Sequence, residues 1–408
     1  MDIQFTKLNY SLSGELKITG SKSESNRLLI LQAQYPSLKI KNISNSEDTK
    51  QIINALKSYD KVIDIRHAGT AMRFLSAYFA FKNGSEVLLT GSKRMKERPI
   101  KILVKALKDL GASIYYQNSE GFPPILIKGL ESSGNYVKLS SSTSSQYISA
   151  LMLIAPRFSN GLNIELTGQT TSLPYIEMTK SLLKKIDIEV ECKDQNIFIS
   201  EKKEDITKTI TVESDWSSAS YFFSMVALSS NANLILKSFK NKSLQGDSCL
   251  ISIFNKLGVS SKIFENKITL TKQMSFDRPE SITLNLINSP DIAQTIAVTC
   301  FGLGVNCNLY GLHTLKIKET DRLSALKKEL TKFGAKITIS SNSIHIISSK
   351  KPNKNIKVST YQDHRMAMAF TPLALKTSLI IEDADVVNKS YPDFWKDIKK
   401  IGFEHNII

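Results

Sequence analysis

A short polar cluster at the start of an apolar helix recurs along this chain at nearly constant spacing. The clusters occupy the same place in each copy and lie at Ser23–Arg27, Gly69–Met72, Ser144–Tyr147, Ser217–Ser220, Asp291–Gln294 and Asp363–Met366. From residue 69 onward the starts are 75, 73, 74 and 72 residues apart, and the first copy is shorter. Because a fixed period marks one supersecondary unit built repeatedly, we expect six similar units.

The end of each unit is also recognisable. Gly111, Gly258 and Gly334 each follow an amphipathic segment, which is where glycine commonly ends a helix. Apolar and polar residues then alternate at 336–339 and 344–347, and this alternation predicts strands. We therefore predict the α/β class, with α+β repeats of a βαβαββ type.

Six units group naturally as three plus three, since the 408 residues exceed what one hydrophobic core usually supports. The boundary between the third and fourth units falls near residues 211–215. A strand near residues 16–20 precedes the first unit, and we assign it to the second half. We expect one domain at 20–213 and another at 1–19 plus 214–408.

The composition is that of a globular protein, with 41% hydrophobic and 23% charged residues. No apolar run approaches the roughly 20 residues of a membrane helix. Residues 1–7 show no signal-peptide or transit character, so we expect a cytoplasmic protein. The cysteines are scattered without a C-x-x-C pair, which favours small buried side chains over metal or redox roles; they are Cys192, Cys249, Cys300 and Cys307.

The basic residues are of two kinds. The net charge is +16, yet only nine of the 54 basic residues are arginine. Lysine can replace arginine where only solubility matters, but not where a planar fork must grip a phosphate or a carboxylate. The arginines are therefore enriched in candidate anion sites. The lysines spread along the chain without a basic block, which favours a solvated surface over a nucleic-acid groove.

Polar residues at the unit starts of the first half are candidates for anion binding. Lys22, Ser23 and Arg27 offer a point charge, a hydroxyl and a guanidinium fork, and the alternative is an ordinary N-cap. Gly69 lets a ligand approach the backbone closely, or marks a plain turn. Arg98 belongs to a charged run of the kind that usually forms a solvated face. Helix starts with hydroxyls or amides can bind phosphate or only cap the helix; they contain Ser144, Ser145, Gln146, Ser172 and Tyr175.

The second half carries acids as well as bases at its unit starts. Asp291 heads an apolar helix, where it caps the helix or acts as a general base if it is desolvated. Residues 318–322 place a lysine and an arginine four apart, as a surface charge ladder or as part of a site. Residues 363–365 are three polar groups before a wholly apolar helix, and this pattern favours a functional role. Lys389 adds a base before the final helix.

From about residue 20 to residue 393 the chain resembles the 5-enolpyruvylshikimate-3-phosphate synthase family. The motifs that carry the resemblance are Gly20–Ser23, Ala68–Arg73, Arg94–Pro99, Ser144–Gln146, Lys318–Arg322 and Asp363–Met368. The resemblance implies two domains, each of three βαβαββ units, in the inside-out α/β barrel of enolpyruvyl transferases. It also implies an active site in the interdomain cleft.

The resemblance implies a reaction as well. The family transfers the enolpyruvyl group of phosphoenolpyruvate to the 5-hydroxyl of shikimate 3-phosphate and releases phosphate, by addition and elimination through a tetrahedral intermediate. It requires no metal or cofactor. We expect a monomer that acts on these small substrates in aromatic amino acid biosynthesis, without a nucleic-acid or membrane partner. We also expect glyphosate to inhibit it.

Residue by residue, the resemblance assigns two binding sets. Shikimate 3-phosphate would be held by Lys22, Ser23, Arg27, Ser144, Ser145, Gln146, Ser172, Tyr175, Asp291 and Lys318. Phosphoenolpyruvate would be held by Lys22, Gly69, Arg98, Gln146, Arg322, Arg365 and Lys389. Asp291 would accept the proton of the attacking hydroxyl, and Glu319 would protonate the methylene carbon. Lys22 and His364 would complete the catalytic set, with His364 assisting the proton transfers.

Three positions depart from the family pattern. His67 stands where the family usually has Asn, Phe74 where it has Pro, and Thr314 where it has Asn. By the resemblance, His67 and Phe74 border the phosphoenolpyruvate pocket, and Thr314 replaces a contact to shikimate 3-phosphate. None of the three removes a charged group from the mechanism.

Two other functions fit part of the sequence. The sister enolpyruvyl transferase that acts on UDP-N-acetylglucosamine typically carries a loop cysteine as acid, but residues 94–99 contain none. A polyanion- or nucleic-acid-binding repeat protein would account for the charge of +16. It predicts binding to DNA or RNA that weakens steeply with salt.

Overall fold

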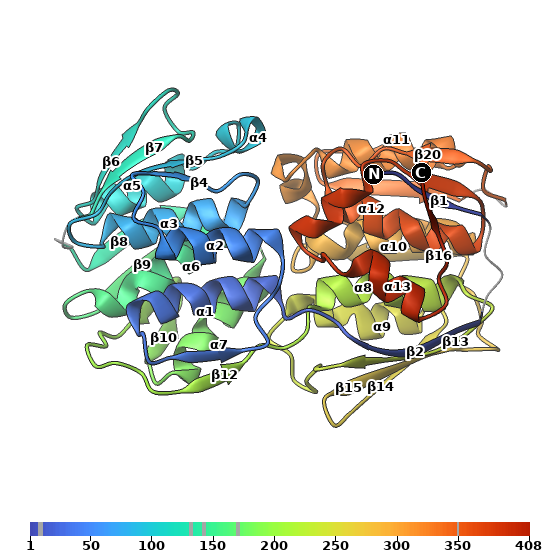
Figure 1. Ribbon diagram of the computed structural model, residues 1–408, viewed down its shortest axis with the longest axis horizontal. Coiled ribbons are helices and arrows are strands. Elements are labelled where there is room, and N and C mark those ends of the chain that lie inside the picture. The colour runs from blue at the N-terminus through green and yellow to red at the C-terminus, as the bar shows by residue number, and fades with distance from the viewer. Residues whose placement is uncertain (7–10, 130–133, 141–143, 169–171, 349–350) are drawn as a thin grey trace. The chain divides into compact units, whose positions relative to one another are not determined.

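The computed structural model describes residues 1–6, 11–129, 134–140, 144–168, 172–348 and 351–408. These residues form two compact units, which are shown in Figure 1. Unit 1 contains Met1–Thr19 and Glu213–Ile408, and unit 2 contains Gly20–Val212. Ser142 and Thr143, which directly precede the predicted polar cluster at Ser144–Tyr147, lie outside the described residues.

Unit 1 contains three four-stranded sheets among the described residues. One has the order β14 (Val259–Phe264), β15 (Lys267–Lys272), β13 (Asn231–Lys237), β2 (Ser11–Lys17). The second has the order β16 (Ser281–Asn285), β17 (Asn306–Tyr310), β19 (Ser343–Ile347), β18 (Lys336–Ile339). The third has the order β20 (Ile356–Val358), β21 (Leu379–Ile381), β1 (Ile3–Phe5), β22 (Asn406–Ile407).

The sheets of unit 2 repeat this plan. One has the order β4 (Val62–Asp64), β5 (Glu86–Thr90), β7 (Ile125–Lys128), β6 (Ser113–Tyr116). Another has the order β10 (Val190–Lys193), β11 (Asn196–Ile199), β9 (Leu162–Thr167), β8 (Tyr136–Ser140). The sheet of the shorter first copy pairs only β3 (Lys39–Lys41) with β12 (Thr209–Thr211).

All five four-stranded sheets share one pairing pattern. In each, two strands run parallel, the second of them pairs antiparallel with a third strand, and that strand pairs antiparallel with a fourth. Parallel neighbours need a crossover connection, and antiparallel neighbours can be joined by a hairpin. Among the described residues, the sheets of β4–β7, β8–β11 and β16–β19 each form within one continuous βαβαββ segment, whereas the other two include β2 or β1 from the start of the sequence. The predicted α/β class with α+β repeats is confirmed.

In each of the six βαβαββ repeats, the first helix is more buried than the second. These helices are α1 (Lys22–Gln34), α3 (Gly69–Ala80), α6 (Ser145–Ile154), α8 (Trp216–Leu228), α10 (Ala293–Leu303) and α12 (His364–Phe370). Every residue of α12 is buried, as is every residue of α8 except Ser217. A helix that is apolar all round is stable only when it is enclosed. Accordingly α8, α10 and α12 pack against one another in unit 1, and α1, α3 and α6 do so in unit 2.

The second helix of each βαβαββ repeat is amphipathic and partly exposed. These helices are α2 (Glu47–Lys57), α5 (Lys101–Asp109), α7 (Leu173–Lys185), α9 (Leu250–Asn255), α11 (Arg322–Lys332) and α13 (Phe394–Lys400), and α4 (Lys93–Lys96) is a short additional turn. Gly111 and Gly334 follow α5 and α11 with φ of 98° and 102°. Both therefore adopt the left-handed conformation that ends a helix, as their position predicts.

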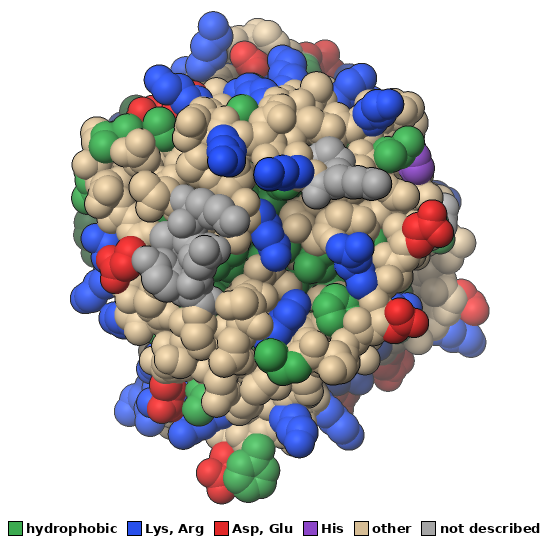
Figure 2. Space-filling view, turned by 90° about the vertical axis from the view of Figure 1, so that its right-hand side faces the viewer, with side chains coloured by type: hydrophobic (Ala, Val, Ile, Leu, Met, Phe, Trp, Pro, Cys, Tyr) green, Lys and Arg blue, Asp and Glu red, His purple; other side chains and the backbone are tan. Residues whose placement is uncertain are grey.

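The lengths of the helices and the distribution of basic side chains on the surface bear on binding to membranes and to polyanions. Within the described ranges, no helix combines the length and the apolar character that crossing a membrane requires. On the face shown in Figure 2, lysine and arginine side chains are scattered among uncharged ones. This scatter resembles a solvated surface more than a nucleic-acid groove.

Candidate functional site

Hydrogen bonds join residues in the N-terminal halves of four helices of unit 2. Gln146 at the start of α6 donates from Nε2 to the Thr70 hydroxyl at the start of α3, over 3.4 Å. Arg27 in α1 donates to the hydroxyls of Ser149 in α6 and Thr179 in α7, at 3.0 and 2.7 Å. Because helix N-termini carry unpaired N–H groups and partial positive charge, this arrangement suits anions.

Lys22 lies in the first turn of α1. Ser21 caps this helix by accepting a hydrogen bond from the Glu24 amide. The Lys22 ammonium forms an ion pair with Asp48 of α2 at 3.1 Å, and its side chain stays 18% exposed. An ammonium has three donors, so Lys22 can bind Asp48 and still donate to a ligand.

Arg27 is buried and bonded to neutral groups of the protein. Besides Ser149 and Thr179, it donates to the main-chain carbonyls of Ser23 and Tyr175, at 2.9 and 3.3 Å. The rings of Phe74 and Tyr175 flank its guanidinium at 5.3 and 5.8 Å. Burial lowers the pKa of Arg27 to about 10. The structure thus gives Arg27 a task that the sequence did not indicate, which is to tie α1, α6 and α7 together.

Gly69 is explained by Arg98 rather than by a turn. A Cβ at Gly69 would lie 2.9 Å from Cζ of Arg98, closer than side-chain carbons approach. Arg98 is 8% exposed, and no other side chain in the described ranges forms a hydrogen bond or ion pair with its guanidinium. The prediction that the charged run forms a solvated face is therefore wrong for Arg98. Arg98 is a buried cation that lies against Gly69, the first residue of α3.

The segment that carries Arg98 is fixed from two sides. Arg73 donates from Nη2 to the Pro99 carbonyl at 3.1 Å and from Nη1 to the Gly69 carbonyl at 3.1 Å. Tyr147 donates its hydroxyl to the same Pro99 carbonyl at 2.6 Å. Arg73 is 4% exposed. Its hydrogen bond to the Pro99 carbonyl holds the main chain next to Arg98 in place.

The hydroxyl residues predicted to bind substrate lie at helix starts. Ser144 caps α6 and accepts a hydrogen bond from the Gln146 amide at 3.3 Å. Ser145 and Ser172 are buried, and Ser172 precedes α7 in the left-handed region with φ of 54°. A serine rarely adopts this conformation without a structural or functional reason. Tyr175 follows in the first turn of α7, and its ring contacts Arg27.

Unit 1 presents a cluster of opposite character, built around Arg322 at the start of α11. Arg322 is 1% exposed and binds three carboxylates. Its Nε donates to Asp363 at 2.7 Å, its Nη1 to Asp291 at 2.9 Å and its Nη2 to Glu319 at 2.9 Å. Burial opposes the charge, but Asp363, Glu319 and Asp291 together raise the pKa of Arg322 above its ordinary value.

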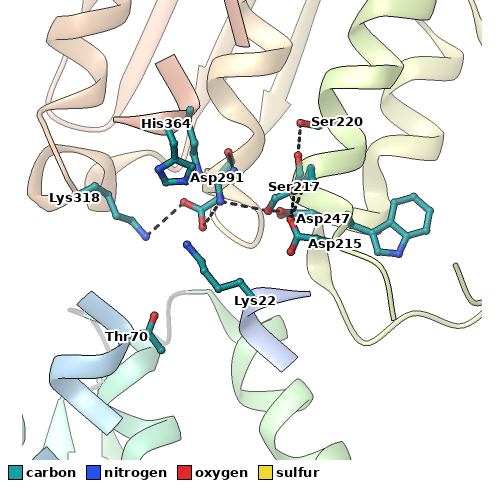
Figure 3. A network of polar contacts seen from close by, with 12 residues as sticks. Lys22, Thr70, Asp215, Ser217, Ser220, Asp247, Asp291, Lys318 and His364 are labelled. Atoms are coloured by element: carbon teal, nitrogen blue, oxygen red, sulfur yellow. Dashed lines mark hydrogen bonds and ion pairs between the residues drawn. The ribbon is translucent and has the colours of Figure 1, made fainter. Parts of the chain in front are cut away.

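Asp291 is the most heavily surrounded of these acids, and Figure 3 shows its carboxylate facing Lys318. Lys318 lies 3.5 Å away, and Arg365 approaches the second oxygen at 3.3 Å. Burial would raise the pKa of Asp291, but Arg365, Lys318 and Arg322 hold it well below the ordinary value. Asp291 is therefore ionised and only weakly basic while these cations point at it.

Glu319 and Lys389 form the other arm of the cluster. The Lys389 ammonium lies 2.9 Å from Oε1 of Glu319, and Arg322 holds Oε2. Lys389 is 8% exposed and the Glu319 side chain 13%. Together with Lys318 and the two arginines, Lys389 completes four cations around three carboxylates.

The start of α12 supplies His364 and Arg365. His364 is 1% exposed, and its Nδ1 lies 3.6 Å from Asp363. Arg365 donates to the Asp291 carbonyl at 3.0 Å and to the Ser217 hydroxyl at 3.3 Å. The sequence favoured a functional role for residues 363–365 but assigned roles only to His364 and Arg365, and none to Asp363. Its position directly before them was the available signal.

Asp247 and Ser217 are further members that the sequence did not indicate. The Ser217 hydroxyl donates to Asp247, and Figure 3 shows these two residues beside Asp215, the cap of α8. Burial, together with the charge of Asp291, raises the pKa of Asp247 to about 7. Ser217 stands at a recognised unit start, but no sequence pattern marks Asp247.

The three departures from the family pattern have clear surroundings. His67 Nδ1 lies 2.9 Å from the Ser92 hydroxyl. Phe74 is 1% exposed and packs against Arg27. The Thr314 hydroxyl is buried without a hydrogen-bond partner among the described residues. A buried hydroxyl of this kind ordinarily needs a partner such as a water or a ligand.

Repeated βαβαββ units that gather buried cations and ionised acids at helix starts define an enzyme class that transfers groups between small anionic substrates. The family model of EPSP synthase (3-phosphoshikimate 1-carboxyvinyltransferase) matches residues 56–398. The chain belongs to this family.

Similar proteins cover nearly the whole chain. A 3-phosphoshikimate 1-carboxyvinyltransferase of Bacteroides fragilis (strain YCH46) is 42% identical over 397 residues, which cover 96% of each chain. One from Mannheimia haemolytica is 32% identical over 425 residues, covering 96% of this chain and 97% of the relative.

The fold is shared with solved structures of low sequence identity. An EPSP synthase from Acinetobacter baumannii superposes with a TM-score of 0.80 at 19% identity, covering 99% of both chains. The enolpyruvyl transferase NikO from Streptomyces tendae has a TM-score of 0.74 at 11% identity, covering 99% of this chain and 98% of that one.

Proposed function

We propose that this chain transfers the enolpyruvyl group of phosphoenolpyruvate to the 5-hydroxyl of shikimate 3-phosphate and releases phosphate, a step of aromatic amino acid biosynthesis. Family membership supports this activity, as does the 42% identity to a 3-phosphoshikimate 1-carboxyvinyltransferase over 96% of both chains. The observation that carries the mechanism is the buried cluster of Asp291, Glu319 and Arg322. It combines acids for proton transfer with cations for anionic substrates.

The residues of unit 2 hold substrate anions. Arg98 is a buried guanidinium that no acid of the described ranges neutralises, so its charge is available to the phosphate of phosphoenolpyruvate. Lys22 contributes an ammonium to both substrates. The helix-start groups bind shikimate 3-phosphate together with Ser23 and Arg27; they are Ser144, Ser145, Gln146, Ser172 and Tyr175. Gln146 and Gly69 also border phosphoenolpyruvate.

The cations of unit 1 orient the substrates and control the acids. Arg322, Arg365 and Lys389 bind phosphoenolpyruvate, and Lys318 binds shikimate 3-phosphate. When these cations turn part of their charge to substrate anions, the Asp291 carboxylate loses some stabilisation and its pKa rises. Substrate binding thereby converts Asp291 from a weakly basic ion-pair partner into an effective base.

The chemical steps balance within this cluster. Asp291 removes the proton of the 5-hydroxyl as its oxygen attacks C2 of phosphoenolpyruvate, and Glu319 delivers a proton to C3. The tetrahedral intermediate then loses phosphate from C2, which takes up the proton held by Asp291, and the new methyl group returns a proton to Glu319. The double bond is restored and both acids regain their starting protonation states. His364, beside Asp363, assists these transfers. Preorganised cations stabilise the charges that develop, which is commonly the largest catalytic contribution.

The test is an assay for phosphate release by the purified chain. We expect phosphate only when phosphoenolpyruvate and shikimate 3-phosphate are both present, and none when UDP-N-acetylglucosamine replaces shikimate 3-phosphate. Absence of release with the first pair would refute the proposed function. We further propose that the enzyme acts in the cytoplasm and that it is a monomer. Light scattering during gel filtration checks the oligomeric state.

A further inference from the structure

A strained turn precedes the residues that position the unit 1 cluster. Tyr361 and Gln362 have φ of 53° and 55°, and the Asp363 amide donates to the Thr360 carbonyl at 2.9 Å. Two positive φ values at the centre of such a bond describe a type I′ turn, which glycine, asparagine and aspartate favour. Tyrosine and glutamine are strained there, and such strain persists only where surrounding contacts enforce it.

A second pair of successive non-glycine residues with positive φ provides a comparison. Glu265 and Asn266, with φ of 47° and 58°, join β14 to β15 in a hairpin. There the type I′ geometry follows from the twist of the paired strands. The turn at 361–362 instead leads from β20 into α12, so strand pairing does not account for it.

Glu329 of α11 holds the turn in place. This carboxylate is 0% exposed, and Tyr361 donates its hydroxyl to Oε1 at 2.6 Å. The other oxygen accepts from the Ser359 amide at 3.2 Å and from the Lys332 ammonium at 2.6 Å. Burial and Glu329 both raise the pKa of Tyr361 above its ordinary value, so the hydroxyl stays protonated and remains a donor.

The same helix grips both ends of the turn. Arg322 at the start of α11 binds Asp363 at 2.7 Å, and Glu329 binds Tyr361. Arg322 and Glu329 are seven residues apart, so they lie on one helix face about 10 Å from each other. Asp363 also accepts a hydrogen bond from the Arg365 amide at 2.9 Å. The turn therefore determines how Asp363 meets Arg322 and how α12 presents Arg365.

We propose that Tyr361, held by Glu329, is a positioning residue for the reaction, because it keeps the strained turn in the conformation that places Asp363, Arg322 and Arg365. This inference rests on the proposed function. Tyr361 acts on the reacting atoms only through these three residues. Loss of its hydroxyl would let the turn relax and would loosen the ligands assigned to phosphoenolpyruvate more than those assigned to shikimate 3-phosphate.

The test compares Tyr361→Phe with the parent enzyme. Removing one hydrogen bond should raise KM for phosphoenolpyruvate about fivefold to tenfold and change KM for shikimate 3-phosphate by less than about twofold. Hydrogen exchange should become faster in the peptide spanning 363–370, whose first amides Asp363 caps. Tyr136→Phe is the matched control, since it removes an exposed tyrosine–glutamate bond in unit 2 and should leave both KM values and this exchange unchanged.

A second substitution tests the strain itself. Glycine adopts positive φ without a steric penalty, so adding Gln362→Gly to Tyr361→Phe should return KM for phosphoenolpyruvate to within about twofold of the parent. If Tyr361→Phe does not fold, the double variant is compared directly with Gln362→Gly, and closely similar KM and exchange values support the proposal.

Two results would overturn the inference. One is an unchanged KM for phosphoenolpyruvate with unchanged exchange in Tyr361→Phe, whatever happens to its melting temperature. The other is an equal rise in KM for both substrates without rescue by Gln362→Gly. An inactive parent would contradict the proposed function instead, and the exchange comparison would still decide whether Tyr361 holds the turn.

Discussion

Arg27 of unit 2 and Arg322 of unit 1 are held in different ways. Among the described residues, Arg27 donates to hydroxyl and carbonyl oxygens, whereas Arg322 binds three carboxylates. A cation among neutral groups keeps its field for an anion that is always charged, such as a phosphate. A cation among carboxylates also sets their protonation. We infer that unit 2 contributes mainly binding and unit 1 mainly proton transfer.

The largest effect should come from removing the base of unit 1. Asp291→Asn keeps the size of the side chain but cannot accept the hydroxyl proton, so we expect kcat to fall about 10³-fold, within the usual range for general base catalysis. Shikimate 3-phosphate should still bind, as titration calorimetry would show. The control is Asp385→Asn, which changes an exposed aspartate that forms an ion pair with the N-terminal amine of Met1. A kcat near that of the parent would contradict the assignment of Asp291.

A smaller effect should follow from changing the binding cation of unit 2. Arg98→Lys keeps the charge but loses the planar fork, so KM for phosphoenolpyruvate should rise about 30-fold, with kcat little changed. Steady-state kinetics at saturating shikimate 3-phosphate measures this. Arg157→Lys, at an exposed arginine of the same unit, should match the parent. A fall in kcat with KM unchanged would remove the distinction between the two units.

Gly69→Ala tests the same cation indirectly. The added methyl group would meet the Arg98 guanidinium and displace it, so we expect KM for phosphoenolpyruvate to rise about tenfold. Glyphosate should inhibit the parent in competition with phosphoenolpyruvate and should inhibit the variant less. A parent that is indifferent to glyphosate would point first to Phe74. Unchanged KM in Gly69→Ala would show that Arg98 tolerates the methyl group.

The smallest effect concerns Asp247 in unit 1, and we expect it in stability rather than in turnover. Its pKa of about 7 exceeds that of an unfolded aspartate, so the folded state binds the extra proton and loses stability as pH rises from about 4 to 7. A difference of about three pKa units corresponds to about 4 kcal/mol. Urea unfolding should therefore show Asp247→Asn gaining stability over the parent between pH 4 and pH 8. A difference that is constant with pH would show that Asp247 is ionised throughout.

Much of the fold could be predicted because it depends on local patterns. The predicted strands at 336–339 and 344–347 are β18 and β19, since alternation of apolar and polar residues suits a half-buried strand. The polar clusters mark the starts of α1, α3, α6 and α12 to within about two residues, which is the usual uncertainty of helix ends. Period and capping are properties of short segments, so a sequence shows them directly.

The candidate site was predictable only in part. The buried Arg322 and Arg365 stand in recognisable motifs. Their partners Asp363 and Ser217 stand at recognised helix starts but were given no role, and Asp247 was missed. Ion pairs across 41 residues, such as that between Arg322 and Asp363, depend on which helix starts meet in space. A short pattern cannot specify such a pairing. The same limit made Arg98 resemble a solvated residue.

By itself, the sequence determined the repeated unit, the helix starts and the residue types that can bind anions. Periodicity and capping act within a few residues, and the bidentate chemistry of arginine is a property of the side chain itself. Only the tertiary structure decided which charges are buried, which acids surround Arg322, and that Tyr361 and Gln362 occupy a strained turn. Burial and electrostatic coupling depend on contacts between distant segments. They therefore appear only when the helix starts of each unit are brought together.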